Sequence, residues 1–129
     1  MLLFLDTTVL IDHLRGRPAA ERVTALAERG VRAATTAINI EEIVRGLRPP
    51  EEVAAQQLGS GLIVMPITAE AAWIAGTWRR TYAALGKTLW QADCLIAAAA
   101  HLAGAPLATG SPKDFPMPGV DIQHWPVGE

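Results

Sequence analysis

Short apolar runs alternate with longer helix-like segments along this chain, and that alternation limits the possible folds more than any other feature. Strands are expected where the apolar runs fall, at residues 1–5, 31–36, 62–65 and 106–109, with an edge strand at 120–125. The runs at 1–5 and 62–65 lack polar alternation, so both are expected to be buried strands. Helices are expected between the strands, at residues 7–16, 18–30, 38–48, 50–58, 68–85 and 89–103. Strands separated by helices predict an α/β fold, with a mostly parallel sheet of four to five strands and helices on both faces.

The clearest amphipathic pattern belongs to the helix expected at 38–48. Its apolar side chains fall at i, i+3, i+4 and i+7, the spacing of one helix face, and they are Ile40, Ile43, Val44 and Leu47. The Pro49-Pro50 pair then ends the helix. This segment is therefore expected to pack one side against the sheet.

Length and composition indicate one ordinary globular domain over residues 1–129. The chain is half hydrophobic and has no repeat or low-complexity tract. Its net charge of −2 at pH 7 argues mildly against tight non-specific binding to nucleic acid. A single cysteine, Cys94, excludes an intramolecular disulfide and fits a reducing cytoplasm. The longest uncharged stretch, 94–112, is interrupted by His, Gly and Pro and makes a poor membrane span, so a soluble cytoplasmic protein is expected.

Two carboxylates follow predicted strands. Asp6 comes directly after the strand at 1–5, and Asp114 lies five residues beyond Thr109, the end of the strand at 106–109. Parallel strands end at the same edge of a sheet, where ligands of open α/β folds bind. Asp6 and Asp114 are therefore expected to converge.

Two further acids, Glu42 and Asp93, lie on predicted helices. A helical wheel places each roughly opposite the main apolar stripe of its helix. That position is compatible with open solvent and with a cleft at the edge of the sheet, and the wheel does not decide between them.

The chain resembles the PIN-domain family, particularly the VapC-type toxin ribonucleases of toxin–antitoxin pairs. Nearly the whole chain takes part in the resemblance. The residues that carry it are Leu3-Phe-Leu-Asp6-Thr-Thr-Val-Leu-Ile11, Ile38-Asn-Ile-Glu-Glu42-Ile-Val-Arg-Gly46, Asp93-Cys-Leu-Ile-Ala-Ala98 and Leu107-Ala-Thr-Gly-Ser-Pro-Lys-Asp114-Phe115. Asn39 stands where the family often has Thr, and Ser111 where it often has Asn.

The resemblance implies a metal-dependent endoribonuclease that hydrolyses RNA phosphodiester bonds. Magnesium or manganese would be bound by carboxylate oxygens, the ligands that such hard ions prefer. Asp6 and Asp93 are the expected direct ligands, and Glu42 and Asp114 would act through water or complete a second ion. The hydroxyls of Thr8 and Thr109 could orient these ligands. The resemblance further implies that the protein is the toxin of a type II toxin–antitoxin system, that a cognate antitoxin binds it and that it forms homodimers. No membrane association is expected, because the uncharged stretch is a poor membrane span.

Several neighbouring residues allow a functional and a structural interpretation. Arg15, Arg45 and Arg48 could hold the RNA backbone, whereas Arg45 or Lys113 could instead form surface ion pairs with the four acids. Asp12 could border the groove or occupy a solvated position on its helix. The thiol of Cys94 is expected to pack rather than to act as a nucleophile.

Homodimerisation and inhibition give two further hypotheses. The long helix at 68–85 carries Trp73, Trp78 and Tyr82, which could form a subunit contact. An antitoxin segment carrying Arg is expected to enter the acidic cleft, because a guanidinium pairs well with carboxylates.

Two alternative functions remain open on the sequence. One is a PIN-like binding scaffold without activity. The other is a receiver-like phosphotransfer module, which requires an acid after a central strand, whereas Met65 is followed by Pro66-Ile67.

Overall fold

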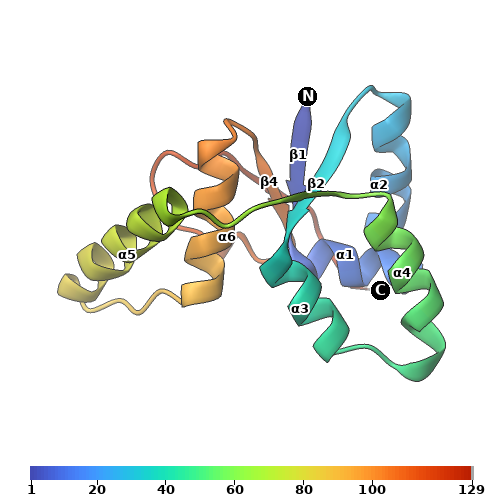
Figure 1. Ribbon diagram of the computed structural model, residues 1–129, viewed down its shortest axis with the longest axis horizontal. Coiled ribbons are helices and arrows are strands. Elements are labelled where there is room, and N and C mark those ends of the chain that lie inside the picture. The colour runs from blue at the N-terminus through green and yellow to red at the C-terminus, as the bar shows by residue number, and fades with distance from the viewer. Residues whose placement is uncertain (129) are drawn as a thin grey trace.

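Within residues 1–128, which the computed structural model describes, five strands form one sheet in the order β3-β2-β1-β4-β5 (Figure 1). All four strand pairings are parallel, which confirms the predicted α/β architecture. Glu129, the last residue of the domain expected at 1–129, lies outside the described residues. The strands are β1 (Leu2–Leu5), β2 (Arg32–Thr36), β3 (Ile63–Met65), β4 (Leu107–Thr109) and β5 (Ile122–His124).

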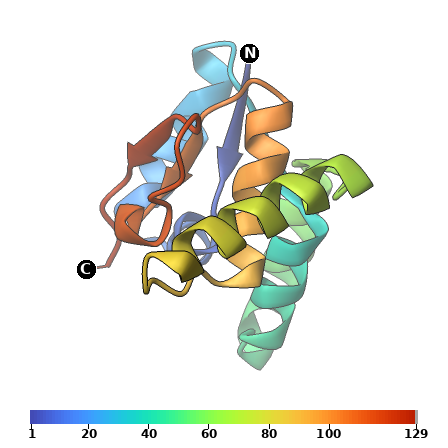
Figure 2. The same ribbon diagram turned by 90° about the vertical axis from the view of Figure 1, so that its left-hand side faces the viewer.

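Helices cover both faces of the sheet, as predicted. In Figure 1, α5 and α6 lie on one side of the strands and α2 and α4 on the other. Figure 2 shows α5 crossing in front of α6. The α-helices are α1 (Thr7–Leu14), α2 (Ala19–Glu28), α3 (Ala37–Arg45), α4 (Glu52–Ser60), α5 (Ala69–Ala84) and α6 (Gln91–Leu102), and the short 3-10 helices are η1 (Pro49–Glu51) and η2 (Pro112–Asp114).

The side chains on the two faces of β1 pack into two separate hydrophobic cores. Phe4 packs with the alanine-rich face of α6 and with α5, whereas Leu3 and Leu5 pack with residues of α1, α2 and α3. Successive side chains of a strand point to opposite faces, so a continuous apolar run is required when both faces are covered. The first strand therefore has the buried character expected of it.

The expectation of a buried strand at 62–65 is wrong. β3 stands at the edge of the sheet and pairs only with β2 among the described strands. Val64 is accordingly 45% exposed. A short run of Ile, Val and Met has the same composition in a central strand and in an edge strand, so the sequence does not distinguish the two.

Helix α3 ends earlier than the predicted 38–48. Its last residue is Arg45, and Gly46 caps it. Ile43 is buried, whereas Val44, on the same predicted stripe, is 60% exposed. Only part of the predicted apolar stripe therefore packs inward. None of the helices among residues 1–128 is long and apolar enough to cross a membrane.

Candidate active site

The carboxyl ends of β1 and β4 bring Asp6 and Thr109 together. Leu5 is paired with Ala108, and the backbone N–H of Asp6 donates to the carbonyl of Ala108 at 2.9 Å. One residue further along β4, the Thr109 hydroxyl donates to Oδ2 of Asp6 at 2.8 Å. The strand register thus places a hydroxyl donor directly on the first acid.

Asp6 is almost completely buried, with 5% of its surface exposed. Burial raises the pKa of its carboxyl, and the hydrogen bonds from Thr109, the Thr7 backbone and Thr8 oppose that shift. The Thr8 hydroxyl lies 3.2 Å from the same oxygen that Thr109 contacts. Both threonines therefore orient Asp6, as the sequence predicted.

The same hydroxyls hold the loop after β4. The backbone N–H of Gly110 donates to Thr8 Oγ1 at 2.9 Å, and that of Ser111 donates to Thr109 Oγ1 at 3.0 Å. This loop leads into η2, which ends at Asp114. The two threonines consequently link the first acid to the segment that carries the fourth.

Asp93 lies in the first turn of α6 and is half-buried. Burial, followed by the charges of Asp6, Asp114 and Glu42, raises the pKa of Asp93 to about 7. Charges contribute to a pKa only over short distances, so Asp6, Asp114 and Glu42 lie near Asp93. The structure therefore brings the four predicted acids around one region at the edge of the sheet.

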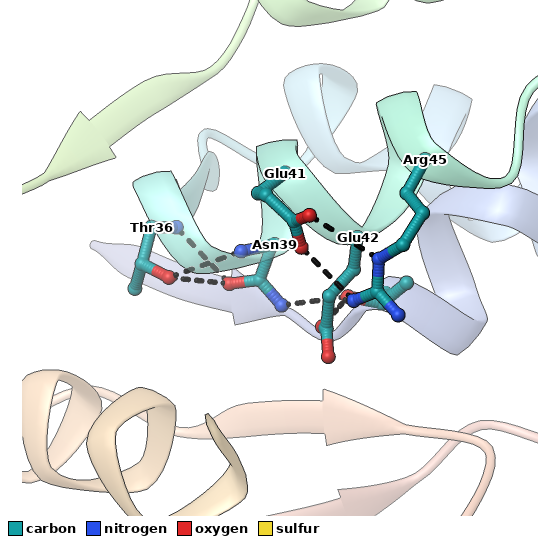
Figure 3. Close-up of polar contacts among 6 residues, drawn as sticks. Thr36, Asn39, Glu41, Glu42 and Arg45 are labelled. Carbon is teal, nitrogen blue, oxygen red and sulfur yellow. Dashed lines mark hydrogen bonds and ion pairs between the residues drawn. The ribbon is translucent and has the colours of Figure 1, made fainter. Parts of the chain in front are cut away.

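Glu42 faces this region from α3, which settles the choice that the helical wheel left open. It is half-buried, and its Oε1 accepts a hydrogen bond of 2.6 Å from the Thr7 hydroxyl (Figure 3). Arg45 lies nearby but donates to Glu41 at 2.9 and 3.2 Å. Glu42 thus has a hydroxyl partner rather than an arginine.

Asp114 completes the group from η2. It is exposed, whereas the other three acids are buried or half-buried. Its charge nevertheless contributes to the raised pKa of Asp93.

The four acids are not surface ion pairs. Among residues 1–128, the salt bridges are Arg15–Glu51 at 3.1 Å and Arg45–Glu41 at 2.9 Å. The expected alternative, in which Arg45 or Lys113 forms a surface salt bridge with an acid of the site, is therefore wrong. The same pairs engage two of the three arginines expected to contact RNA.

Asp12 neither borders the groove nor faces solvent, so both interpretations of it are wrong. It is 3% exposed. Its Oδ2 accepts from the N–H of Ala19, the first residue of α2, and its Oδ1 accepts from the N–H of Gly128, both at 2.9 Å. Asp12 is buried because it satisfies two backbone donors, one of them at the positive end of a helix.

Cys94 packs in the core, as expected. It is fully buried, and burial raises the pKa of its thiol to about 11. A thiol that stays protonated at neutral pH is a poor nucleophile.

The donor set of this region fits magnesium or manganese. All four side chains are carboxylates, and the raised pKa values of Asp6 and Asp93 show that a nearby positive charge would be favourable. Among the described residues, no three acids, histidines or cysteines lie close enough to enclose an ion. Magnesium usually keeps several water ligands and needs only one or two carboxylates, so wider spacing is compatible with it.

Sequence reasoning gave Thr7 no role and considered Asn39 only as a possible cap of the helix at 38–48, where Thr36 is the N-cap. The Thr7 hydroxyl contacts Glu42, and the Asn39 side chain contacts Thr7 at 3.0 Å. The only signal in the sequence was a second hydroxyl residue between Asp6 and the apolar part of α1.

Comparison with known proteins gives the same assignment throughout. A family model described as "PIN domain" matches residues 3–115. Ribonuclease VapC19 of Mycobacterium tuberculosis is 34% identical over 114 residues, which cover 88% of this chain and 91% of that protein. Ribonuclease VapC10 of the same organism is 32% identical over 116 residues, covering 90% of this chain and 87% of that protein.

Solved structures agree with the sequence relatives. DNA-bound VapBC from Salmonella typhimurium superposes with a TM-score of 0.82 at 25% identity, covering 97% of this chain and 99% of that one. A toxin–antitoxin complex from Klebsiella pneumoniae gives a TM-score of 0.73 at 28% identity, covering 92% and 94%. The matched segment begins before Asp6 and extends past Asp114. The chain therefore belongs to the PIN-domain family and is a relative of the VapC ribonucleases.

Proposed function

We propose that this protein is a magnesium- or manganese-dependent endoribonuclease that hydrolyses RNA phosphodiester bonds, and the toxin of a type II toxin–antitoxin system. The observation that carries the proposal is the acid cluster. Burial, followed by the charges of Asp6, Asp114 and Glu42, raises the pKa of Asp93, and none of the four acids has a salt-bridge partner among residues 1–128. Its relatives named as VapC ribonucleases support the choice of RNA as substrate.

In this proposal Asp6 and Asp93 bind the ion, and Glu42 and Asp114 act through water or at a second ion. A bound ion would activate a water molecule and neutralise charge on the scissile phosphate. Two residues of the chain orient one of the proposed metal ligands. Thr8 and Thr109 keep the Asp6 carboxylate in one orientation, and Asp93 would lose its proton on binding the ion.

The proposed partner is an antitoxin, which the known VapBC complexes support. A groove of about 360 Å³ between α3 and α4 is lined by apolar side chains that include Ile40, Val44 and Leu47. We propose that an apolar antitoxin segment covers this groove and that an Arg beside it enters the acid cluster, where its planar fork can pair with carboxylates. Inhibition would then compete with metal binding.

We also propose that the protein acts as a homodimer in the cytoplasm, where its RNA substrate is found. The dimer would form through α5. Three aromatic residues were expected there. Trp78 packs against His101 and the Tyr82 hydroxyl donates to the carbonyl of Pro116, so both are half-buried against the protein's own core. Trp73 is 78% exposed and remains available for a subunit contact.

Cleavage of a labelled RNA with and without metal tests the function. We expect cleavage with Mn²⁺ or Mg²⁺ and none in excess EDTA. Asp6→Asn and Asp93→Asn should each reduce turnover by about 100-fold, because each removes a charge that the ion needs. Glu41→Gln is the matched control, since Glu41 pairs with Arg45 outside the cluster and should leave turnover unchanged.

Undiminished cleavage in EDTA would exclude the metal mechanism. A wild-type protein that binds Mn²⁺ and the antitoxin but cuts no RNA would instead identify an inactive PIN-like scaffold.

A further inference from the structure

A directed chain of hydrogen bonds leads to Glu42 from the start of α3. Its first link is Asn39, which is 1% exposed. The Oδ1 atom of Asn39 accepts from the Thr36 backbone N–H at 3.1 Å and from the Thr36 hydroxyl at 2.8 Å. A backbone N–H can only donate, so the atom that faces it must be the amide oxygen. The orientation of the Asn39 side chain is thereby determined.

The second link fixes the direction of the Thr7 hydroxyl. With its oxygen on Thr36, Asn39 directs its amino group at Thr7, and the distance from Nδ2 to Oγ1 is 3.0 Å. An amide NH₂ has no acceptor capacity, so Thr7 Oγ1 must accept this bond. The one hydroxyl hydrogen of Thr7 is then left for another partner.

That partner is Glu42. Thr7 Oγ1 and Glu42 Oε1 are 2.6 Å apart, within the range of a hydroxyl donating to an ionised carboxylate. Figure 3 shows the contacts of Thr36 and Asn39 running beneath α3, with a carboxylate oxygen of Glu42 pointing away from the helix. One oxygen of Glu42 is thus held by Thr7, and the second has no hydrogen-bond partner among residues 1–128.

We propose that Thr7 is a positioning residue for Glu42, and that Asn39 acts through Thr7 by fixing the direction in which its hydroxyl donates. Neither residue needs to touch substrate. The inference rests on the proposed function in one respect, namely that Glu42 contributes to metal binding. It assigns to Asn39 a role beyond its capping of α3.

Binding of Mn²⁺ to the purified protein, measured by calorimetry without RNA, tests this inference independently of catalysis. Glu42→Gln should weaken binding. Thr7→Val, which keeps the side-chain shape but lacks the hydroxyl, should weaken binding about tenfold, as the loss of an orienting partner typically does. Thr7→Ser keeps the hydroxyl and should bind like the wild type.

Combined substitutions separate positioning from a general structural effect. Once Glu42→Gln is present, Thr7→Val should cause no further loss, because no carboxylate remains to be oriented. Asn39→Ala should weaken binding in the wild-type background and have no effect in the Thr7→Val background. Far-ultraviolet circular dichroism shows whether each variant is folded, and Thr7→Ala replaces Thr7→Val in the same comparisons if the valine variant is not.

The outcomes distinguish this inference from the proposed function. If Glu42→Gln weakens binding and Thr7→Val does not, the positioning role is wrong and the metal site stands. Additive losses in the double variant would also overturn the positioning role. If Glu42→Gln binds Mn²⁺ normally, both the metal role of Glu42 and the inference are wrong, and a wild type that binds no Mn²⁺ would exclude the metal site altogether.

Discussion

Asp93 has the most strongly perturbed carboxyl of the site, and its surroundings predict a pH-dependent affinity for metal. Burial and three neighbouring acids raise its pKa to about 7 from an ordinary value of 3.8. Below pH 7 an ion must displace a proton from Asp93, whereas above pH 7 it need not. Mn²⁺ affinity should therefore rise by about tenfold per pH unit up to about pH 7 and level off above it.

Calorimetric titration with Mn²⁺ at pH 5.5, 6.5, 7.5 and 8.5 measures this dependence. Asp93→Asn should bind more weakly and with a shallower slope, because Asn has no proton to lose. An affinity that does not change over this range would show that Asp93 is already ionised.

The residues of the site differ in how far a sequence can reveal them. Asp6 and Asp114 follow predicted strands, so the rule for parallel sheets is enough to bring them together. Glu42 and Asp93 needed the family resemblance, because a helical wheel cannot show what a helix faces. The roles of Thr7 and Asp12 depend on contacts of α1 with α3 and α2. The local sequence pattern of α1 does not indicate those contacts.

At the level of elements, α1 connects the acid cluster to the rest of the fold through Asp12. Replacing Asp12 by Asn leaves one acceptor and places an NH₂ group against a backbone N–H. One buried donor then lacks a partner, which costs about 1–3 kcal/mol. The variant should lose this much free energy of unfolding.

Urea denaturation of Asp12→Asn beside Asp121→Asn checks this expectation. Asp121 is exposed, so the same chemical change there should have little effect on stability. Equal stability of the two variants would mean that the contacts of Asp12 with Ala19 and Gly128 contribute nothing.

The elements themselves were predictable to within a few residues, and the burial of β1 was predicted as well, whereas the exposure of β3 was not. Pro18, Gly104 and the pair Pro49-Pro50 mark helix boundaries in the sequence. In the structure α2 begins directly after Pro18, η1 begins at Pro49, and α6 ends two residues before Gly104. The edge position of β3 depends on which side of β2 the chain takes after α4. The packing of whole helices determines that position, so the three apolar residues of β3 do not indicate it.

For the whole molecule, the exposed face of α5 predicts a homodimer. This face is formed by Ala69, Ala72, Trp73, Gly76, Thr77 and Arg80. Its small residues leave room for the aromatic side chain of a second copy, and burying Trp73 would stabilise the contact. Light scattering at micromolar concentration should give about twice the chain mass of 13.7 kDa.

Trp73→Ala should shift the protein toward the monomer. Trp90→Ala provides the control, because Trp90 is also exposed, at 68%, but precedes α6 and lies off this face. A wild-type protein of 13.7 kDa at this concentration would contradict the dimer.

The sheet order has a consequence for folding while the chain is being synthesised. β4 lies beside β1 in space, although α1 to α6 come between them along the chain. The contact between Thr109 and Asp6 joins residues 103 positions apart, and Asp114 follows later still. A nascent chain that has already folded β1, β2 and β3 still lacks the partner that orients its first acid. The acid cluster is therefore complete only after β4 and η2 have been synthesised, so the first half of the chain cannot assemble it alone.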